Sequence, residues 1–408
     1  MLTTPRSYRM PAFREAADRL GVDIVIGMDL PSELADQWPG VLALDFRRTD
    51  SAVRQIVSLA QERTLSGILA VDDSGSLLAA TAAKALNLPH NQPSAAEAAR
   101  DKALMRTMLD RGGLPTPWFR VFTTRDHPAD VALQVPYPCV VKPIDLNGSR
   151  GVIRADSPAE LIAAIDRVKK IIQRPLLDEP QPYLVEAYIP GIEIALEGLL
   201  DNGRLKVLAL FDKPDPLEGP YFEETIYVTP SRLPPEIQED VSRVTIEAVR
   251  ALGLSIGPVH AEMRINNHGI WIVELAGRSI GGLCSQVLRF GIDGSLEELI
   301  IGQMSGINLA QEKNERSAAS GVMMIPIPTA GILRQVKGVE EALAIPLIEN
   351  IELTARLNYP LTPLPDGDSY LGFIFARGET PEAVESAMRE AHRRIAFSID
   401  PFFELLPL

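Results

Sequence analysis

The sequence has 408 residues, enough for about two to three domains at roughly 150 residues per domain. Hydrophobic residues make up 46% and charged residues 23%, proportions that exclude a chain dominated by disorder. The formal net charge is −14, and no local basic patch offsets it, so we expect neither nucleic-acid nor membrane binding. The two cysteines, Cys139 and Cys284, have no neighbouring Cys or His. We therefore expect no disulfide framework or zinc site, and a cytoplasmic location.

Residues 1–93 are predicted to form a parallel α/β domain of the Rossmann-like kind, because apolar runs alternate with helical patterns. The predicted strands cover residues 22–26, 41–44 and 67–71, and the predicted helices cover residues 13–20, 49–62 and 76–86. Little room remains for a full strand before the first helix. Either that strand is reduced to a few residues, or the chain as given begins late.

The rest of the chain is predicted to form a mixed α/β and α+β region over 94–310 and a small α+β domain over 311–408. Helix signals are clear in several places: a start at Pro93 with an end near Gly112, a capping box at Ser157, and a stop at Gly253. The predicted helices cover residues 93–112, 158–172, 235–252 and 381–395, and the predicted late strands cover residues 322–327 and 370–376.

Two glutamates in the segment 260–274 carry the first chemical signal. Asn267-His268-Gly269 separates two apolar runs, as in a β-hairpin with glycine at the left-handed position. If Asn266 pairs with Ile270, Glu262 faces Glu274 across the ladder, at ~5 Å. Two like charges so close favour a bound cation or a raised pKa. By the period of two, His260 and Arg264 lie on the same face.

Spacing alone leaves open an alternative, a solvent-exposed hairpin in which Arg264 neutralises Glu262. The residues that follow, Leu275-Ala276-Gly277-Arg278-Ser279-Ile280-Gly281-Gly282, favour the first interpretation. A carboxylate at a strand end, followed by an arginine and a glycine pair, is typical of a site for magnesium and a phosphate-bearing intermediate.

Two upstream segments fit a bound nucleotide. The apolar run 137–143 contains Lys142, and the Gly/Ser loop 147–152 follows it. Backbone N–H groups of such a loop approach phosphate oxygens closely, and the lysine adds a positive charge. Next, Glu186 and Glu193 flank an apolar segment that could hold a purine ring and then a ribose.

In their order and spacing, these segments, together with the helix start at Asp101-Lys102, resemble the ATP-grasp superfamily over residues 95–310. Within it, the L-amino acid ligases, which join amino acids into dipeptides, are the most similar subfamily. That resemblance rests on Asp212-Lys213-Pro214, Tyr221-Phe222-Glu223-Glu224-Thr225, His260-Ala261-Glu262, Glu274 to Gly282, Gly321 to Pro326 and Leu371 to Gly378. It implies ATP and Mg²⁺ as cofactors, with Mn²⁺ as a substitute, and small carboxylate and amine substrates. It also admits a homodimer.

The resemblance implies a role for each matching ATP-binding residue. Lys102 and Lys142 would hold the α- and β-phosphates, and the loop at Gly148 and Ser149 would close over the β/γ end. Glu186 would accept a hydrogen bond from the adenine amino group. The backbone of Ala187 and Ile189 would meet the ring edge, and Glu193 would bind the ribose hydroxyls.

The resemblance also implies the catalytic roles. Glu262 and Glu274 would hold Mg²⁺, and Arg278 would stabilise the acyl phosphate and the tetrahedral intermediate. The substrate-contacting residues would be His260, Arg278, Ser279, Gly281 and Gly282.

One departure concerns Ala276, which stands where many ATP-grasp enzymes carry a further asparagine ligand. Because Mg²⁺ keeps waters readily, two carboxylates and the phosphates still suffice. The expected activity is ATP-dependent amide formation through an acyl phosphate, releasing ADP and phosphate. Two alternatives stay open: an ATP-grasp ligase or carboxylase acting on a non-amino-acid carboxylate or bicarbonate, and a nucleotide-binding regulatory protein without catalysis.

Overall fold

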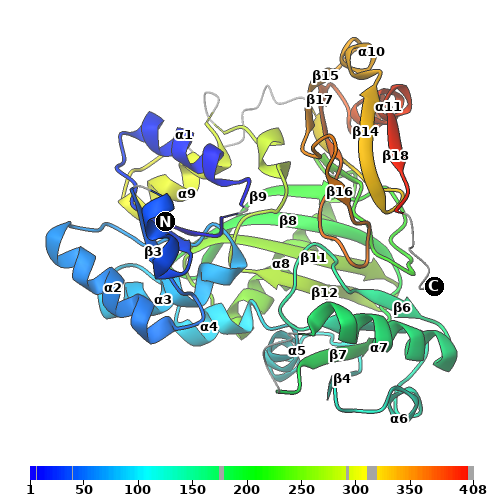
Figure 1. Ribbon diagram of the computed structural model, residues 1–408, viewed down its shortest axis with the longest axis horizontal. Helices are drawn as coiled ribbons and strands as arrows, with labels where there is room; N and C mark the ends of the chain where they lie inside the picture. The colour runs from blue at the N-terminus through cyan, green and yellow to red at the C-terminus, as the bar shows by residue number, and fades with distance from the viewer. Residues whose placement is uncertain (6, 39, 174–178, 291–293, 310–318, 403–408) are drawn as a thin grey trace, which may run out of the picture.

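The computed structural model describes residues 1–5, 7–38, 40–173, 179–290, 294–309 and 319–402. Within them the strands form four sheets of three, eight, three and four strands. The large sheet runs through the middle of the molecule, with the N-terminal elements on one side and the C-terminal elements on the other (Figure 1). None of the helices in these residues has the length and apolar character needed to cross a membrane.

The N-terminal unit is a short parallel sheet with helices packed on it. Its strands are β1 (Leu2–Thr3), β2 (Ile26–Asp29) and β3 (Val41–Leu44), and its helices are α1 (Met10–Leu20), α2 (Thr49–Glu62) and α3 (Ser76–Ala85), with the short helices η1 (Ser32–Gln37) and η2 (Asp73–Gly75). The expected strand at 22–26 is displaced to β2. The expected strand at 67–71 is wrong, because within it only Ala70 makes a bridge, to Leu2. The strand before the first helix, β1, has two residues.

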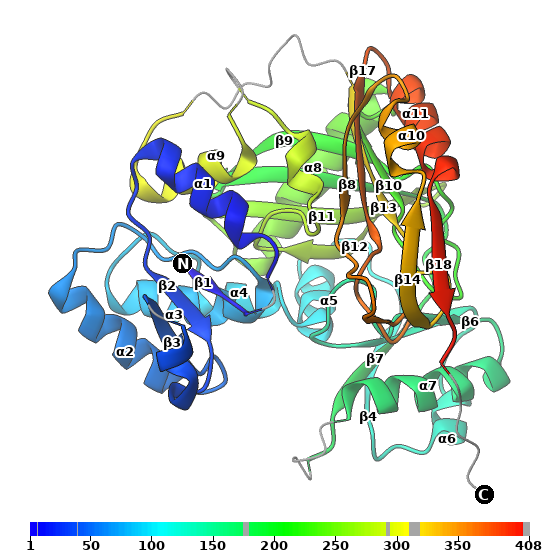
Figure 2. The same ribbon diagram turned by 45° about the horizontal axis from the view of Figure 1, so that its top comes forward.

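A four-stranded antiparallel sheet forms the next unit, in the order β4-β7-β5-β6. Its strands are β4 (Phe119–Thr123), β5 (Cys139–Pro143), β6 (Ile153–Ala155) and β7 (Pro182–Ala187), and the accompanying helices are α4 (Pro93–Ala98), α5 (Lys102–Arg111), α6 (Pro128–Ala132) and α7 (Pro158–Ile172). The single helix expected over 93–112 is broken in two, because the Asp101 side chain accepts hydrogen bonds from the backbone of Ala103 and Leu104 and starts a new helix. Figure 2 shows this unit with α7 beneath the large sheet.

The large sheet is antiparallel throughout, in the order β12-β11-β8-β9-β10-β13-β17-β15. Its strands are β8 (Ile192–Asp201), β9 (Arg204–Asp212), β10 (Ile226–Thr229), β11 (Gly257–Asn266), β12 (Gly269–Ala276), β13 (Ala319–Ile325), β15 (Ile348–Leu353) and β17 (Gly372–Gly378). Strands from both sides of residue 310 share this sheet. The boundary expected at 310 therefore does not separate two sheets, and the domain division stays a prediction.

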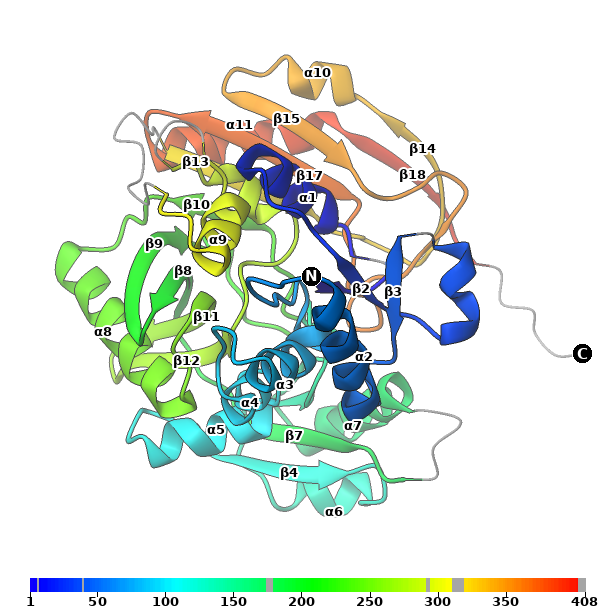
Figure 3. The same cartoon turned by 90° about the vertical axis from the view of Figure 1, so that its left-hand side faces the viewer.

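Each face of the large sheet is covered by different helices. One face packs on α5 and on α8 (Pro235–Leu252), which ends as expected at Gly253 in the left-handed conformation. The other face packs on α1, the short helix η3 (Cys284–Val287) and α9 (Leu296–Ser305). Because side chains alternate along a strand, positions 193, 195, 197 and 199 of β8 share this second face. In Figure 3, α8 and α9 lie beside the strands β8, β9 and β11.

The C-terminal elements add a third small sheet. β14 (Gly331–Lys337) lies between β16 (Pro360–Leu361) and β18 (Ala396–Asp400), with α10 (Val339–Leu343) and α11 (Pro381–Arg394) nearby. The expected helix at 381–395 is confirmed within one residue, and the expected strands near 322–327 and 370–376 are shifted by two or three residues to β13 and β17.

Candidate active site

The hairpin β11–β12 brings Glu262 opposite Glu274, as predicted, but by a different route. Asn266 pairs with Gly269 rather than with Ile270, so the turn is one residue shorter than expected. A β-bulge at Val273 then takes up the difference, because Met263 pairs with Ile272 while Glu262 pairs with Glu274. The prediction of the pair is confirmed, and the predicted register near the turn is wrong.

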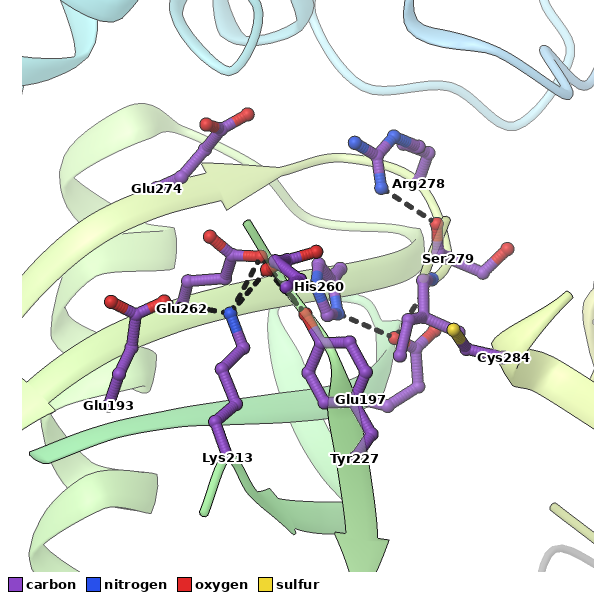
Figure 4. A network of polar contacts seen from close by, with 12 residues as sticks. Glu193, Glu197, Lys213, Tyr227, His260, Glu262, Glu274, Arg278, Ser279 and Cys284 are labelled. Carbon is purple, nitrogen blue, oxygen red and sulfur yellow. Dashed lines mark hydrogen bonds and ion pairs between the residues drawn. The ribbon is translucent and has the colours of Figure 1, made fainter. Parts of the chain in front are cut away.

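A buried lysine lies among three carboxylates beside this hairpin (Figure 4). The Lys213 ammonium is 2.8 Å from Glu193, 2.5 Å from Glu224 and 3.3 Å from Glu262. The Tyr227 hydroxyl donates to Glu224 at 2.7 Å. Burial alone would lower the pKa of Lys213, but the three carboxylates raise it well above its ordinary value. The lysine is therefore held in its charged form.

The pKa values of two glutamates in this cluster, Glu224 and Glu262, shift in opposite directions. Burial raises the pKa of Glu224, and the neighbouring Glu262 raises it further. Burial would also raise the pKa of Glu262, but Lys213 and His260 lower it below its ordinary value. Glu262 is thus the ionised member of the pair, and Glu224 is the member that holds a proton more readily.

The carboxylates fit a divalent cation by their chemistry. Oxygens of Glu193, Glu224 and Glu262 lie within 4.8 Å of one another, and carboxylate oxygens are the ligands that Mg²⁺ prefers. Glu274 lies apart from this cluster in Figure 4 and pairs instead with Lys102, whose ammonium is 3.6 Å away. Glu224 is therefore a candidate metal ligand that the sequence analysis did not identify.

His260 links the cluster to a fully buried carboxylate on β8. Its Nδ1 lies 3.1 Å from Glu197, and its Nε2 lies 3.5 Å from Glu262. Burial alone would lower the pKa of His260, but hydrogen bonding and charge interactions with these two glutamates raise it to about 9. Glu197 also accepts a hydrogen bond from the backbone N–H of Ile280 at 3.0 Å. The imidazole thus presents a positive charge beside the metal-binding candidates.

The alternative in which Arg264 neutralises Glu262 is wrong. The Arg264 guanidinium instead bonds to Glu193 at 2.8 Å and to the backbone oxygen of Ile189 at 2.8 Å. Glu193 is therefore held between Arg264 and Lys213. Its predicted contact with ribose hydroxyls stays a prediction, and such a contact would share the carboxylate with two protein cations.

Glu186 and Lys142 form a second buried charge cluster with Arg106. The Lys142 ammonium is 2.5 Å from Glu186, and Arg106 bonds to both carboxylate oxygens of Glu186. Burial alone would raise the pKa of Glu186, but Arg106 and Lys142 lower it to about 2. Burial lowers the pKa of Lys142 to about 8, against the opposing effect of Glu186.

The predicted adenine and phosphate contacts stay predictions, and the structure shows what engages these groups. Both oxygens of Glu186 already accept from cations, and the backbone N–H of Ala187 donates to the backbone oxygen of Trp118 at 2.8 Å. The Lys102 ammonium donates to the backbone oxygen of Leu146 at 2.6 Å. A nucleotide would therefore exchange with existing protein contacts.

The Gly/Ser loop lies against the C-terminal part of the chain. Gly148 and Ser149 both have left-handed backbone angles, with φ of 62° and 54°. The Gly151 N–H donates to the backbone oxygen of Pro365 at 2.8 Å, and Arg150 donates to that of Asp366 at 2.8 Å. The loop is thus tied to the segment between β16 and β17.

Several residues of the site lay outside the sequence interpretation. Lys213 and Glu224 were part of the motifs quoted for the resemblance but had no role assigned, and Arg106 had no recognised signal. The strand-end position of Lys213, directly after a nine-residue apolar-rich strand, is the same signal that drew attention to Lys142.

Comparisons with known proteins agree with this geometry. Residues 135–287 match an ATP-grasp domain, residues 14–90 match an ATP-grasp N-terminal domain, and residues 323–400 match the L-amino acid ligase C-terminal domain 2. The chain belongs to the ATP-grasp superfamily, and the predicted fold class, a Rossmann-like α/β domain followed by an ATP-grasp fold and a small α+β domain, is confirmed.

The chain resembles the L-amino acid ligases in particular. The crystal structure of an L-amino acid ligase from Bacillus licheniformis superposes with a TM-score of 0.81 at 26% identity, over 98% of each chain. A carboxyaminoimidazole ribonucleotide synthase from Aspergillus clavatus, solved with ATP, has a TM-score of 0.72 at 18% identity, covering 96% of this chain and 98% of that one, which shows the fold alone.

Curated relatives are ligases and a protein without an assigned activity. The uncharacterized protein y4rH of Sinorhizobium fredii is 25% identical over 99% of this chain and 82% of its own length. The alanine–anticapsin ligase of Bacillus subtilis strain 168 is 27% identical over 62% of this chain. The match spans 55–66% of the length of the three alanine–anticapsin ligases found.

Proposed function

We propose that the protein is an ATP-dependent carboxylate–amine ligase that forms an amide, with L-amino acids as the substrates and a dipeptide as the product. One observation carries the proposal. Glu262 and Glu274, which pair across the ladder, are flanked by Lys213 and His260 at Glu262 and by Lys102 at Glu274. Such a site combines anionic metal ligands with cations able to neutralise phosphate charge.

The proposed chemistry has two steps. A carboxylate oxygen of the acid attacks the γ-phosphorus of ATP, the bond from that phosphorus to the β,γ-bridging oxygen breaks, and ADP leaves. The amine nitrogen then attacks the acyl carbon of the acyl phosphate, phosphate leaves, and the nitrogen loses a proton. Phosphorylation is needed because a free carboxylate would have to expel oxide.

The chain's own residues supply charge and orientation. Arg278 and His260 would face the developing negative charge of the acyl phosphate and of the tetrahedral intermediate. Lys102 and Lys142 would hold the nucleotide phosphates. Glu262 and Glu274, with Glu224 beside them, would hold Mg²⁺, or Mn²⁺ in its place, which supplies charge neutralisation at the phosphates when bound.

The preference for amino acids rests on the C-terminal part of the chain and on overall similarity. Residues 323–400 match the L-amino acid ligase C-terminal domain 2, and the L-amino acid ligase structure matches over nearly the whole chain. Cytoplasmic location and a homodimeric state remain expectations of the same proposal. Both cysteines are free and buried, as a reducing compartment allows.

The test is a substrate screen. The protein is incubated with ATP, Mg²⁺ and pooled L-amino acids, and ADP, phosphate and dipeptide masses are measured, with an EDTA-treated reaction as the inactive control. We expect ADP release that requires both an acid and an amine, with equal amounts of phosphate and dipeptide. Hydroxylamine added without an amine should trap the acid as its hydroxamate. ADP release with bicarbonate but with no amino acid, or nucleotide binding without turnover, would contradict the proposal.

A further inference from the structure

Three side chains of the N-terminal unit hold the loop at residues 278–282. Asp73 accepts a hydrogen bond from Nε of Arg278 at 2.7 Å. Arg9 donates to the hydroxyl of Ser279, and the hydroxyl of Tyr8 accepts from the backbone N–H of Gly282 at 3.1 Å. These contacts join residues more than 200 positions apart in the chain. The loop expected to contact the substrate is therefore attached to the first unit as well as to its own strand.

The contact between Asp73 and Arg278 is largely shielded from solvent. The exposed fractions of the two side chains are 8% and 14%. Burial alone would raise the pKa of Asp73, but Arg278 lowers it below its ordinary value. Burial alone would lower the pKa of Arg278, but Asp73 raises it. Both groups are thus ionised, and a charge-assisted hydrogen bond of this kind has a well-defined geometry.

Asp73 itself has a rigid support. It begins η2, and the preceding Val71 donates its N–H to the backbone oxygen of Leu2 at 2.9 Å. A Cβ added at Gly75, two residues further on, would lie 3.1 Å from the Leu2 side chain, so the turn packs closely against β1. Val71 also accepts a hydrogen bond from Arg9 at 2.6 Å. The carboxylate therefore has little freedom to move.

Arg278 has few other restraints in the described residues. Besides its bond to Asp73, Arg278 donates from Nη1 to the backbone oxygen of its neighbour Ser279, at 3.0 Å. A contact with the next residue moves with the loop and does not determine where the guanidinium points. Asp73 therefore supplies the contact from another part of the chain that fixes the direction of the planar guanidinium.

We propose that Asp73 is a positioning residue for Arg278, through which the N-terminal unit orients the guanidinium toward the acyl phosphate. This inference rests on the proposed ligase function and extends it. Without the carboxylate, Arg278 keeps its charge but loses its fixed direction. A displacement of about 1 Å at such a group costs on the order of 100-fold in rate. Nucleotide affinity should change little, because the Asp73 carboxylate bonds to Arg278 and acts on the predicted ATP-binding residue Lys102 only through a weaker charge interaction.

Asp72 provides a matched control in the same turn. Its carboxylate accepts hydrogen bonds from Thr3, Thr4 and Ser7, which all belong to the N-terminal unit. D72N therefore removes the same charge from the neighbouring position without touching Arg278. Comparison of D72N with D73N separates positioning of Arg278 from general stability of the turn.

The experiment measures amine-dependent ADP release, the KM for ATP and the dissociation constant of ADP for the wild type, D72N, D73N, R278M and the double variant D73N/R278M. We expect D73N to lower kcat by about 10- to 100-fold, with less than about 2-fold change in ADP affinity, and D72N to stay within about 2-fold of the wild type in kcat. Because Asp73 acts through Arg278, D73N should cause no further loss in the R278M background.

Each other outcome has a defined meaning. If the wild type turns over and D73N does so at the same rate, this inference alone is overturned. It is also overturned if D73N causes an equal loss of kcat in the wild-type and R278M backgrounds. A wild-type protein with no amine-dependent turnover overturns the proposed function and this inference with it. If D73N does not fold, D73E serves instead, since it keeps the charge and lengthens the side chain by one methylene: kcat must fall while ADP affinity stays constant.

Discussion

Replacing Arg106 with methionine should destabilise the protein by about 4 kcal/mol. Arg106 is fully buried and donates to both oxygens of Glu186, at 2.8 and 3.2 Å, and to the backbone oxygens of Ile272 and Val273, both at 2.9 Å. In a regular strand, successive carbonyls point to opposite sides. These two reach the same guanidinium because they lie at the bulge of β12.

The magnitude follows from what methionine leaves behind. A buried carbonyl without a donor costs about 1–3 kcal/mol, and removal of one partner of a buried ion pair costs about 3–5 kcal/mol. The two carbonyls, of Ile272 and Val273, together cost about 2–6 kcal/mol. Because Lys142 still pairs with Glu186 in the variant, the ion-pair cost is largely avoided, and the total is about 4 kcal/mol. Because Arg106 donates to the two carbonyls at the bulge, its loss should also destabilise the strand pairing that places Glu262 opposite Glu274.

The assay is urea unfolding followed by tryptophan fluorescence. Trp271 is two residues from Val273, and Trp118 accepts the N–H of Ala187 beside Glu186, so both report on this region. For a slope of about 3 kcal/mol/M, a loss of about 4 kcal/mol lowers the midpoint by about 1.3 M. R111M, at an exposed position on the same helix, should cost less than about 1 kcal/mol. Equal midpoints for R106M and R111M would refute the reasoning.

Three further predictions concern the site and its supports. E262Q and E274Q should each raise the Mg²⁺ concentration needed for half-maximal ADP release by at least about 10-fold, and EDTA should abolish turnover; unchanged metal dependence would exclude these ligands. Since the pKa of Lys142 is about 8, ADP affinity should be highest below pH 8 and fall as pH rises through it, because the lysine loses the charge that binds phosphate. Calorimetry from pH 6.5 to about 9.5 measures this, and K142R should remove the fall. D101A should lower stability by about 1 kcal/mol in thermal unfolding, since it removes the N-cap of α5, and a loss below about 0.3 kcal/mol would contradict that role.

Local signals determined several elements without reference to the rest of the fold. The helix at 158–172 was predicted residue for residue, because Ser157 caps it and Pro158 occupies its first position. The helix at 235–252 ends where Gly253 adopts the left-handed conformation. These interactions lie within one or two turns of chain, so the sequence alone contains them.

The hairpin β11–β12 was determined partly by local signals and partly by a distant contact. Alternating residues and a turn signal identified β11 and β12 and the facing glutamates. The turn is one residue shorter than predicted, and a bulge in β12 restores the pairing of Glu262 with Glu274. Arg106, on a distant helix, donates to the carbonyls at this bulge. A bulge depends on such a partner, and no local pattern reveals where the partner lies.

The first unit shows the limit of apolar patterning. Residues 67–71 are apolar as a strand would be, yet only Ala70 makes a bridge to Leu2. A strand requires a neighbour with free backbone groups, and β1 is only two residues long. The pattern indicates burial, and whether a ladder forms depends on what lies beside the segment.

The sequence by itself determined the superfamily, most helices, and the residue types from which the site is built. Only the tertiary structure decided which charges meet: Lys213 with three glutamates, Arg106 with Glu186, and Asp73 with Arg278. The reason is physical. The period of a segment reports which of its faces is buried, whereas the partner of a buried charge is set by the packing of separate elements, 11 to 205 residues apart in these pairs, where desolvation requires every charge to be compensated.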